Sequence, residues 1–596
     1  MGITRMERVD RGASTAVLWI AVGAAIVALA AAVPLVLASH YGALGIPRSD
    51  DWSYLLVQFR FVDHGTVRLN NWVSMTLIGQ VLLGAPVALL SDHSITAMQV
   101  FTAVLGLIGL AAVLRAGRQT VGSRWVGAFV AVMVAAGPLW GPLAASFMTD
   151  VPAFAFGMLA LVVGIDALRR RPVSIPLVAA SVALGFVAFS IRQYAVVAPV
   201  AVIVSAAWVL AHEHDRKRLR VLAVLSAVFV VLAIALFVWW RNLPESLALA
   251  PVFPNGHSIK GLVIKGTDLW RLVGLLCAPA VVLAGPARLV RRAWRSSARL
   301  TGWLTVLCAL LLAAIYFHVP KRPFVGNYVS RDGVLTTDVM TGTRPNVVPR
   351  AVFDLMVLVG SLAAILLVLA LVPALMEGGR RLRRRDLAPP GPAVLVFGTT
   401  VLGFALAYAV ALVTDLPMYD RYALPVVPLV ALLVLHAGRA ARTEGARASS
   451  EDVGAARGGR FVTTTAVAAW SGVALVALLV VGLAYTADSA SFDGARWRAA
   501  TALTHRGYTP LQIDGGFEWN SYHFGGAPST VRAPNSATSA KRKPSARERR
   551  LHYCVKLSMG EARPGTRPIG SQPYDAPTRA PSRIVEAVTR PCVPSG

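Results

Sequence analysis

The sequence predicts an all-α polytopic membrane protein with a small polar segment at its C-terminal end. Of 596 residues, 56% are hydrophobic and only 15% are charged, which is not the composition of a soluble protein. The formal net charge of +28 would suggest a nucleic-acid partner in a soluble chain. Here the basic residues form short clusters between apolar runs, the pattern that orients a protein in a membrane. We therefore expect no nucleic-acid partner.

The first apolar run, 15–39, is too long for the core of a signal peptide and is interpreted as a membrane anchor. Three arginines precede it, so the N-terminus is expected to be cytoplasmic. A second run, 73–90, is long enough to cross, but a crossing there would place nearly every later basic loop outside. Residues 60–90 are therefore interpreted as amphipathic or re-entrant segments of a long first external loop, 40–94.

From there, apolar runs and basic clusters alternate regularly, which predicts about thirteen transmembrane helices within residues 1–485. The N-terminus is then cytoplasmic and the C-terminus extracytoplasmic, in a multi-pass protein of the cytoplasmic (plasma) membrane. The predicted spans are 15–39, 95–114, 125–143, 151–168, 174–190, 193–210, 219–240, 271–284, 300–317, 351–375, 393–413, 422–436 and 461–485.

The polar tail is predicted to have two parts. Residues 486–525 contain a helical pattern, then a strand-like run before Asp514-Gly515-Gly516, and are expected to form a small external α/β segment. Residues 526–596 are basic and rich in proline and serine, and are expected to be disordered. Cys554 and Cys592 lie in this part and could pair if the tail is outside the cytosol.

Two acidic motifs emerge on the same predicted side of the membrane. Asp50 and Asp51 are adjacent in the first external loop, and such a pair beside a membrane is a candidate base or metal site. The alternative interpretation of this acidic pair is a helix N-terminus capped by Ser49 or Asp50. Asp150 lies at the outer turn between two spans, where a helix N-cap is again the alternative.

Basic and aromatic residues also occur on this side. Arg192 lies at an outer span boundary, and the loop 318–350 carries five basic residues, including Lys321 and Arg322. Such a loop suits either a phosphate group or anionic lipid head groups. The run Asp420-Arg421-Tyr422 lies at the outer start of the twelfth span. Two interpretations fit this run: an interfacial aromatic belt with an ion pair, or a contact to a head group.

Together these motifs resemble the GT-C membrane glycosyltransferases, in the branch of the dolichyl-phosphate-mannose protein mannosyltransferases, aminoarabinose transferases and Rgt-like transferases. The resemblance rests on the acidic pair, the turn 147–152, and the run 420–425. Many relatives have Asp-Glu where this chain has Asp-Asp, which leaves open which acid does the chemistry. The resemblance implies a GT-C-like arrangement of the spans.

The resemblance also implies transfer of a sugar from a polyprenyl-phosphate donor to a glycan, lipid or protein acceptor at the outer face. A carboxylate base must reach the acceptor hydroxyl, and the departing phosphate needs arginine or lysine. The implied catalytic residues are Asp51 or Asp50, with Asp150 positioning acceptor or base. The implied phosphate ligands are Arg192, Lys321, Arg322 and Arg421, and the implied substrate-positioning residues are Trp52, Tyr54, Asp420 and Tyr422.

Two other classes compete with a transferase. A transporter or flippase of a lipid-linked or anionic substrate would place charged residues near the middle of its spans, whereas the predicted spans are almost free of charge in their middles. A scaffold or sensor would act through the tail. No cofactor is predicted, and a divalent metal stays open, although His40, His64 and His93 lack the spacing of metal ligands.

Overall fold

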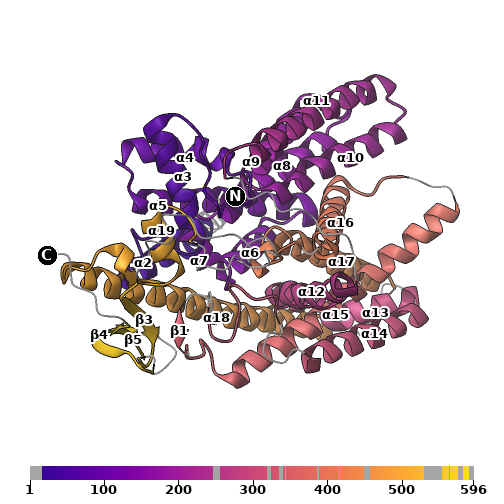
Figure 1. The fold of residues 1–596 in the computed structure, drawn as a ribbon. Coiled ribbons are helices and arrows are strands. Elements are labelled where there is room, and N and C mark those ends of the chain that lie inside the picture. Colours follow the sequence, from indigo (N-terminus) through magenta and orange to yellow (C-terminus); the bar gives the residue numbers. More distant parts are fainter. Residues whose placement is uncertain are drawn as a thin grey trace, which may run out of the picture.

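The computed structural model describes most of the chain. The residues described are 17–245, 256–318, 324–333, 340–342, 344–384, 388–414, 416–448, 457–528, 553–562, 564–574 and 582–589. The fold is mainly helical, with a small sheet at one end of the helical bundle (Figure 1). The predicted all-α membrane architecture with a small C-terminal α/β part is therefore confirmed.

The regular elements described in the N-terminal half are all helices, and its long helices pack side by side. α8 packs against α5 and α9, and α5 also packs against α6. The elements are η1 (Ala28–Ala32), α2 (Val33–His40), α3 (Asp51–His64), α4 (Ile78–Leu90), α5 (Ile95–Val121), α6 (Arg124–Ala136), α7 (Trp140–Ala144), α8 (Asp150–Arg169), α9 (Ile175–Ile191), η2 (Gln193–Val196), α10 (Val197–His212) and α11 (Arg216–Arg241).

The C-terminal half centres on α12, which packs against α15, α17 and α18. Its helices are α12 (Gly256–Ala284), α13 (Pro286–Ser296), α14 (Ala298–His318), α15 (Arg350–Arg383), α16 (Pro392–Val413), η3 (Asp420–Ala423), α17 (Val427–Ala448), α18 (Arg457–His505), η4 (Pro510–Gln512) and α19 (Phe517–Phe524). Its strands are β1 (Thr341–Gly342), β2 (Ile513–Asp514), β3 (Val555–Met559), β4 (Arg567–Tyr574) and β5 (Ser582–Val588).

Among the described residues, ten helices are long and apolar enough to cross a membrane, and α4, α6 and α9 are shorter apolar helices. The predicted spans 125–143 and 174–190 coincide with α6 and α9, which have 13 and 17 residues. At 1.5 Å per residue these helices are roughly 20 and 26 Å long, less than the roughly 30 Å of a hydrocarbon core. The count of about thirteen spans is therefore not confirmed.

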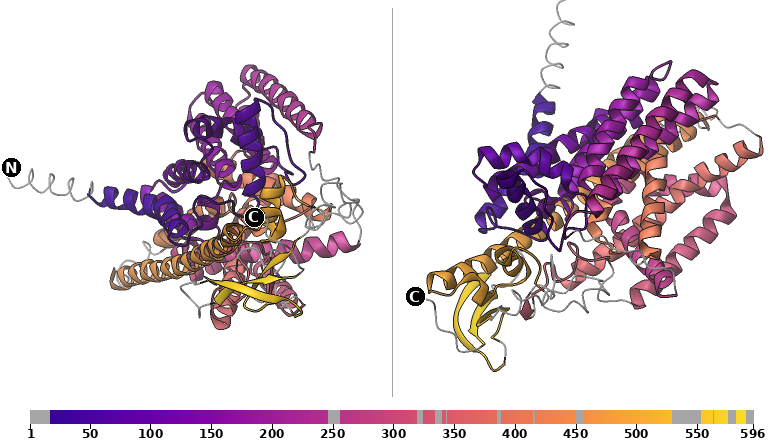
Figure 2. Two further views of the ribbon diagram at one scale, coloured as in Figure 1. Left: turned by 60° about the vertical axis from the view of Figure 1, so that its left-hand side comes forward. Right: turned by 45° about the horizontal axis from the view of Figure 1, so that its top comes forward.

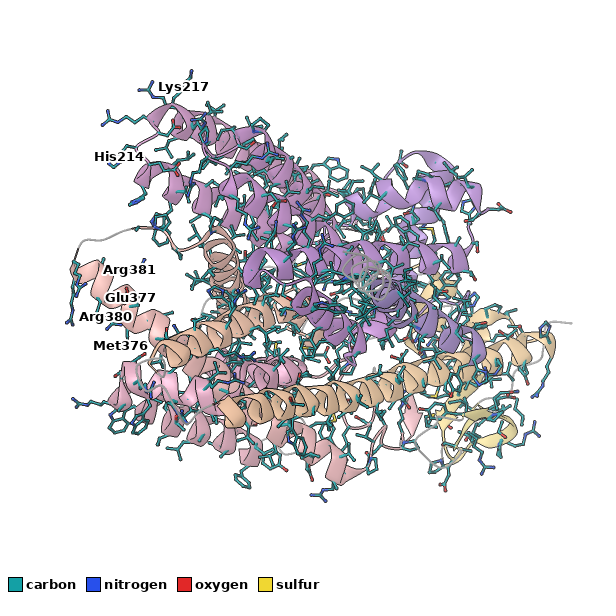
Figure 3. The ribbon with its side chains drawn as sticks, turned by 180° about the vertical axis from the view of Figure 1, so that it is seen from behind. His214, Lys217, Met376, Glu377, Arg380 and Arg381 are labelled. Atoms are coloured by element: carbon teal, nitrogen blue, oxygen red, sulfur yellow. The ribbon has the colours of Figure 1, made fainter. Side chains whose placement is uncertain are left out.

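Basic segments that the sequence predicts to be cytoplasmic gather at one end of the molecule. Figure 3 shows His214 and Lys217, from the α10–α11 turn, on the same side as Arg380 and Arg381 near the end of α15. The C-terminal sheet lies at the opposite end. This separation is what a positive-inside orientation requires.

One expectation about the spans is wrong. Asp268 and Arg271 form a buried ion pair of 2.8 Å within α12, not at a span end. The prediction failed because α12 begins at Gly256, well before the predicted start at 271. Arg271 also donates to Ser361 Oγ (3.1 Å) and to the Leu312 carbonyl (2.8 Å), so the pair joins α12 to α14 and α15.

Strands from three parts of the chain form the C-terminal sheet, in the order β1-β3-β5-β4, with β2 also pairing with β3. β1 comes from the loop between α14 and α15, and it pairs in parallel with the end of β3. Figure 2 shows the sheet beside α19 and the end of α18. The sheet therefore anchors the α14–α15 loop at the end of the molecule that carries the C-terminal segment.

The prediction of disorder over 526–596 is wrong for β3, β4 and β5. Prolines 568 and 573 favoured disorder, but both lie in β4, the edge strand of the sheet, where a missing N–H is tolerated. Cys554 is disulfide-bonded, and its predicted partner Cys592 lies outside the described residues. Cys277 and Cys308 are free.

Candidate active site

Elements that are far apart in the sequence meet around two arginines. They are the start of α3, the turn before α8, Arg192 between α9 and η2, the η3 turn, and residues 324–333 of the α14–α15 loop. The sequence predicted that the acidic and basic motifs lie on one side of the membrane, and the hydrogen bonds below bring most of them into one cluster.

Asp50 is the most accessible acid of the cluster, with a side chain that is 16% exposed. It occupies the N-cap position of α3, but its side chain makes no capping hydrogen bond. Instead, Oδ2 accepts a hydrogen bond from Arg421 Nη2 at 2.8 Å, and Oδ1 accepts one from Trp72 Nε1 at 2.9 Å. The helix-cap alternative therefore does not describe this carboxylate.

Asp51 has a different environment, although it is the next residue. It is completely buried. Its Oδ1 accepts the Arg48 backbone N–H at 2.5 Å, and its Oδ2 accepts the Phe147 backbone N–H at 3.0 Å. Burial raises the pKa of the Asp51 carboxyl well above its ordinary value, against the opposing effect of these two bonds. Asp51 thus ties the first loop to the turn before α8.

Asp150 and Arg192 form the second ion pair of the cluster. Asp150 begins α8, and its Oδ2 accepts from Arg192 Nη1 at 2.8 Å. The same Oδ2 lies 4.0 Å from Arg421 Nε, which is too long for a hydrogen bond. Arg192 also donates to Thr149 Oγ1 at 2.6 Å, and its guanidinium lies 4.9 Å from the centre of the Tyr422 ring. Asp150 is therefore shared between the two arginines.

Several buried polar atoms of this cluster have no hydrogen-bond partner among the described residues. They are Nε and Nη1 of Arg421, Oδ1 of Asp150, Oδ1 of Asp420 and the hydroxyl of Tyr194. Leaving such a group unpaired costs about 1–3 kcal/mol, and more when it is charged. These atoms are therefore available to hydrogen-bond a polar ligand.

Asp420 positions the α14–α15 loop over Arg421. Its Oδ2 accepts the backbone N–H groups of Tyr328 (2.7 Å) and Val329 (2.6 Å). Burial raises the pKa of Asp420 to about 6, with the two backbone bonds acting in the opposite direction. The Tyr328 ring then faces the Arg421 guanidinium at 6.0 Å, and its hydroxyl lies 3.1 Å from Ser49 Oγ.

The structure brings together most of the residues named from the sequence. Asp50, Asp51, Asp150, Arg192, Asp420, Arg421 and Tyr422 belong to the cluster. Trp52 and Tyr54 follow on α3 and are buried. Lys321 and Arg322 lie outside the described residues.

Two cluster residues, Trp72 and Tyr328, were missed by the sequence reasoning. Each is a lone aromatic in an irregular segment, so no periodicity or motif distinguished it. Their contacts to Asp50 and Arg421 arise only from the fold. Among the described residues, no group of three or more His, Cys, Asp or Glu side chains has the arrangement of a metal site.

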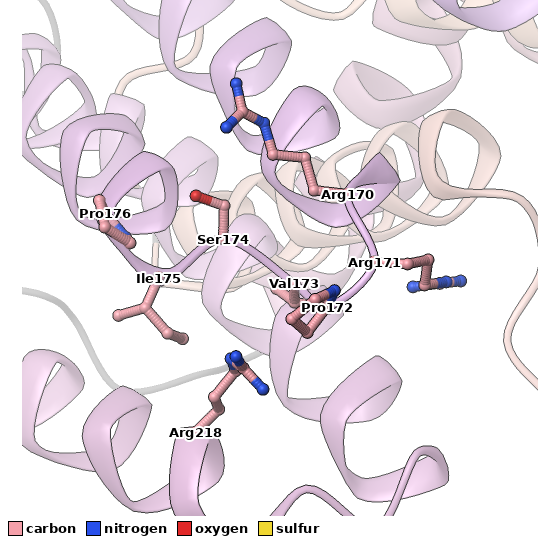
Figure 4. A pocket seen from close by; sticks show the side chains of 8 residues that line it. All are labelled: Arg170, Arg171, Pro172, Val173, Ser174, Ile175, Pro176 and Arg218. Atoms are coloured by element: carbon pink, nitrogen blue, oxygen red, sulfur yellow. The ribbon is translucent and has the colours of Figure 1, made fainter.

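A separate depression of about 500 Å³ lies between the α8–α9 turn and the start of α11. Arg170, Arg171 and Arg218 line it, and Figure 4 shows that the guanidinium groups of Arg170 and Arg171 point to different sides. Arg171 is paired with Glu213 (2.7 Å) and Arg218 with Asp215 (2.5 Å). These arginines do not converge on one anion, so this depression is not favoured as the active site.

The fold and the cluster define a polytopic helical membrane protein with buried Asp–Arg pairs and unpaired donors at one site. A family model described as dolichyl-phosphate-mannose-protein mannosyltransferase matches residues 79–240. The match confirms over those residues the resemblance that the sequence motifs indicated. It includes Asp150 and Arg192, whereas Asp50 and Arg421 lie outside it.

Solved structures give similarities over most of the chain. The crystal structure of ArnT from Cupriavidus metallidurans bound to undecaprenyl phosphate is 14% identical, with 95% of this chain and 98% of that chain covered and a TM-score of 0.42. For its apo state, the identity is 13%, the coverage 96% and 99%, and the TM-score 0.41. The archaeal oligosaccharyltransferase AglB from Archaeoglobus fulgidus, in complex with an inhibitory peptide and a dolichol-phosphate, is 13% identical, with 88% and 61% covered and a TM-score of 0.37. Comparison with curated protein sequences gives no significant match.

Proposed function

We propose that the protein transfers a sugar from a polyprenyl-phosphate-linked donor to an acceptor at the outer face of the membrane. The observation that carries this proposal is the Asp50–Arg421 pair, in which Arg421 keeps two unpaired donor atoms, Nε and Nη1. A carboxylate beside an arginine with free donors is the pair of groups that glycosyl transfer from a phosphate requires.

Arg421 is proposed as the main ligand of the donor phosphate. Its Nη2 donates to Asp50, and its Nε and Nη1, which lie on different edges of the guanidinium, remain as separate donors for phosphate oxygens. Asp150 holds Arg192 at 2.8 Å and lies 4.0 Å from Arg421 Nε, close enough for charge attraction to both guanidinium groups. Lys321 and Arg322 remain proposed phosphate ligands on the strength of the sequence alone.

Asp50 is proposed as the general base, in preference to Asp51. Both oxygens of Asp51 accept backbone N–H groups, and Asp51 is completely buried. The oxygens of Asp50 likewise accept one hydrogen bond each, but its side chain is 16% exposed and can be reached by an acceptor. Since a carboxylate oxygen has room for a second donor, an acceptor hydroxyl can still bind there.

In the proposed step, the acceptor oxygen forms a bond to the anomeric carbon while the bond from that carbon to the phosphate oxygen breaks. The hydroxyl proton passes to Asp50, and the electron pair leaves on the polyprenyl phosphate. Charge that grows on the phosphate is met by the buried Arg421, where water screens it little. Nearby carboxylates also stabilise the oxocarbenium character of the sugar.

The match of residues 79–240 to a family named for dolichyl-phosphate-mannose supports a lipid-phosphate donor. The identity of the transferred sugar is tested separately, with a panel of donors. The test uses purified full-length protein in proteoliposomes, a panel of labelled polyprenyl-phosphate sugars, and membranes from a strain lacking the protein as acceptor source. We expect label to appear in a membrane acceptor as free polyprenyl phosphate forms. Movement of the intact donor across the bilayer without transfer would instead support a flippase.

A further inference from the structure

Trp72, whose indole N–H donates to Asp50, lies in a group of three aromatic rings to which the proposed step gives no role. Trp72 lies 4.7 Å from Phe517, ring centre to ring centre, and Trp52 lies 5.7 Å from Phe517 and 6.4 Å from Trp72. Trp52 is buried, whereas Trp72 and Phe517 are both partly exposed. We call Trp72 and Phe517 the aromatic platform, with Trp52 as its buried support.

The platform is built by two distant parts of the chain. Trp72 belongs to the first loop and Phe517 begins α19 in the C-terminal segment. Asn71 fixes them relative to each other, because its Nδ2 donates to the Ala527 carbonyl (2.7 Å) and its Oδ1 accepts the Ala527 N–H (2.8 Å). Arg60 adds a hydrogen bond to the Gly525 carbonyl at 3.3 Å.

The turn before Phe517 is also specified by its residues. Gly516 has φ +92°, a conformation that other residues rarely adopt, and a side chain on Gly515 would come within 2.6 Å of Trp519. Asn520 accepts the Gly515 N–H (3.1 Å) and donates to Asp514 (2.8 Å). The Asp514-Gly515-Gly516 motif thus sets the position of Phe517.

Asp50 connects the platform to the phosphate side of the site. One oxygen of its carboxylate accepts from Trp72 and the other from Arg421. A molecule lying on the platform is therefore next to the proposed base, on the side away from the proposed phosphate ligand. Aromatic faces carry partial negative charge and suit the weakly positive C–H groups of a sugar ring, while a carboxylate suits its hydroxyls.

We infer that the aromatic platform binds a sugar ring of the acceptor, which makes the acceptor a glycan or glycolipid. This inference rests on the proposed function, because it takes the acceptor hydroxyl to face Asp50. A sugar ring could also come from the donor. The acceptor is favoured because Trp72 and Arg421 approach opposite oxygens of the same carboxylate.

The test measures binding of simple sugars to full-length protein in nanodiscs by saturation-transfer NMR. The probes are the methyl glycosides of mannose, glucose, galactose and arabinofuranose. We expect signals from the ring C–H groups of at least one glycoside. Phe517→Leu, which keeps apolar volume but loses the aromatic face, should weaken that binding about three- to tenfold. Phe517→Tyr should retain it.

Tyr508→Leu is the matched control, because Tyr508 is a partly exposed aromatic of the same C-terminal segment that packs with the core around Trp519. It should bind the glycoside like the unaltered protein. All variants must show unchanged thermal unfolding. No glycoside signal in the unaltered protein, or equal signals in Phe517→Leu, would overturn the inference.

A second arm separates the two sources of a sugar ring. Binding of polyprenyl phosphate is compared with binding of polyprenyl-phosphate-mannose. If Phe517→Leu weakens only the mannose-bearing lipid and leaves the glycosides unaffected, the platform serves the donor and the acceptor assignment is wrong. If unaltered protein binds neither lipid, the proposed function fails, whereas glycoside binding that depends on Phe517 would still support a sugar-binding platform.

Discussion

Asp50 and Arg421 are 371 positions apart in the sequence, yet Asp50 Oδ2 accepts a hydrogen bond from Arg421 Nη2 at 2.8 Å. The pair joins the first loop to the η3 turn before α17, and its arginine is 3% exposed. The pair fixes the position of the Arg421 guanidinium. Because Nε and Nη1 of that guanidinium have no hydrogen bond among the described residues, Arg421 can still bind an anion.

The first prediction concerns the phosphate. Arg421→Lys keeps the charge and can keep the pair with Asp50, but it loses the separate Nε and Nη1 donors of the planar guanidinium. Binding of polyprenyl phosphate should weaken about 10- to 100-fold, as expected for losing a hydrogen bond between charged groups. Arg60→Lys is the control, since Arg60 bonds to the Gly525 carbonyl. Equal affinities in Arg421→Lys and the unaltered protein would contradict the assignment.

The second prediction concerns pH. Asp420 has a pKa of about 6 in the folded protein because it is buried, compared with about 3.9 for an exposed aspartate. Between these values the folded state binds more protons than the unfolded state, so the free energy of unfolding should fall as pH rises. The loss is about 2 kcal/mol from pH 4 to pH 7.

Asp420→Asn is the reference for this measurement. Its side-chain oxygen can accept the same N–H bonds from Tyr328 and Val329, but it does not titrate. The melting temperature of the unaltered protein, relative to this variant, should therefore fall from pH 4 to pH 7. Parallel pH profiles for the two proteins would show that Asp420 is not the titrating group.

The third prediction concerns topology. A reporter fused near Arg384 should behave as cytoplasmic, and one fused at residue 596 as extracytoplasmic. A fusion at the C-terminal position leaves α18 intact, in which the Asp488 carboxylate bonds to Arg344 and Tyr574. The opposite pattern would place the Asp50–Arg421 pair on the cytoplasmic side.

The order and type of the site motifs could be predicted from the sequence, because short acidic and basic runs between apolar spans are visible without a structure. The choice between Asp50 and Asp51 could not. Neighbouring residues at a helix start differ mainly in side-chain direction, and here that direction is set by the backbone N–H groups of Arg48 and Phe147. Nothing in the sequence links these groups to Asp51.

The C-terminal segment was predicted less well for a different reason. The sheet is held together by strands from three regions, including β1 between α14 and α15, and such long-range pairing leaves no local pattern. The same holds for Phe517, whose ring reaches Trp52 and Trp72 only after α19 docks on the first loop. Helices were predicted more reliably because their apolar pattern is local.

The fourth prediction separates the two adjacent acids. Asp51→Asn leaves one of the backbone N–H groups of Arg48 and Phe147 facing an amide NH₂, which should cost about 1–3 kcal/mol of stability. Thermal unfolding should detect this loss, while the protein that stays folded should keep most of its transfer rate. A large loss of rate in folded Asp51→Asn would move the base assignment to Asp51.

The central claim is that Asp50 accepts the proton of the acceptor hydroxyl. Asp50→Asn keeps the size of the side chain and can keep one hydrogen bond to Arg421 or Trp72, but it is not a base. The decisive measurement is the single-turnover rate of labelled sugar transfer from a polyprenyl-phosphate donor by folded Asp50→Asn. We expect a fall of about two to four orders of magnitude with little change in donor binding. A near-normal transfer rate in this variant would contradict this claim.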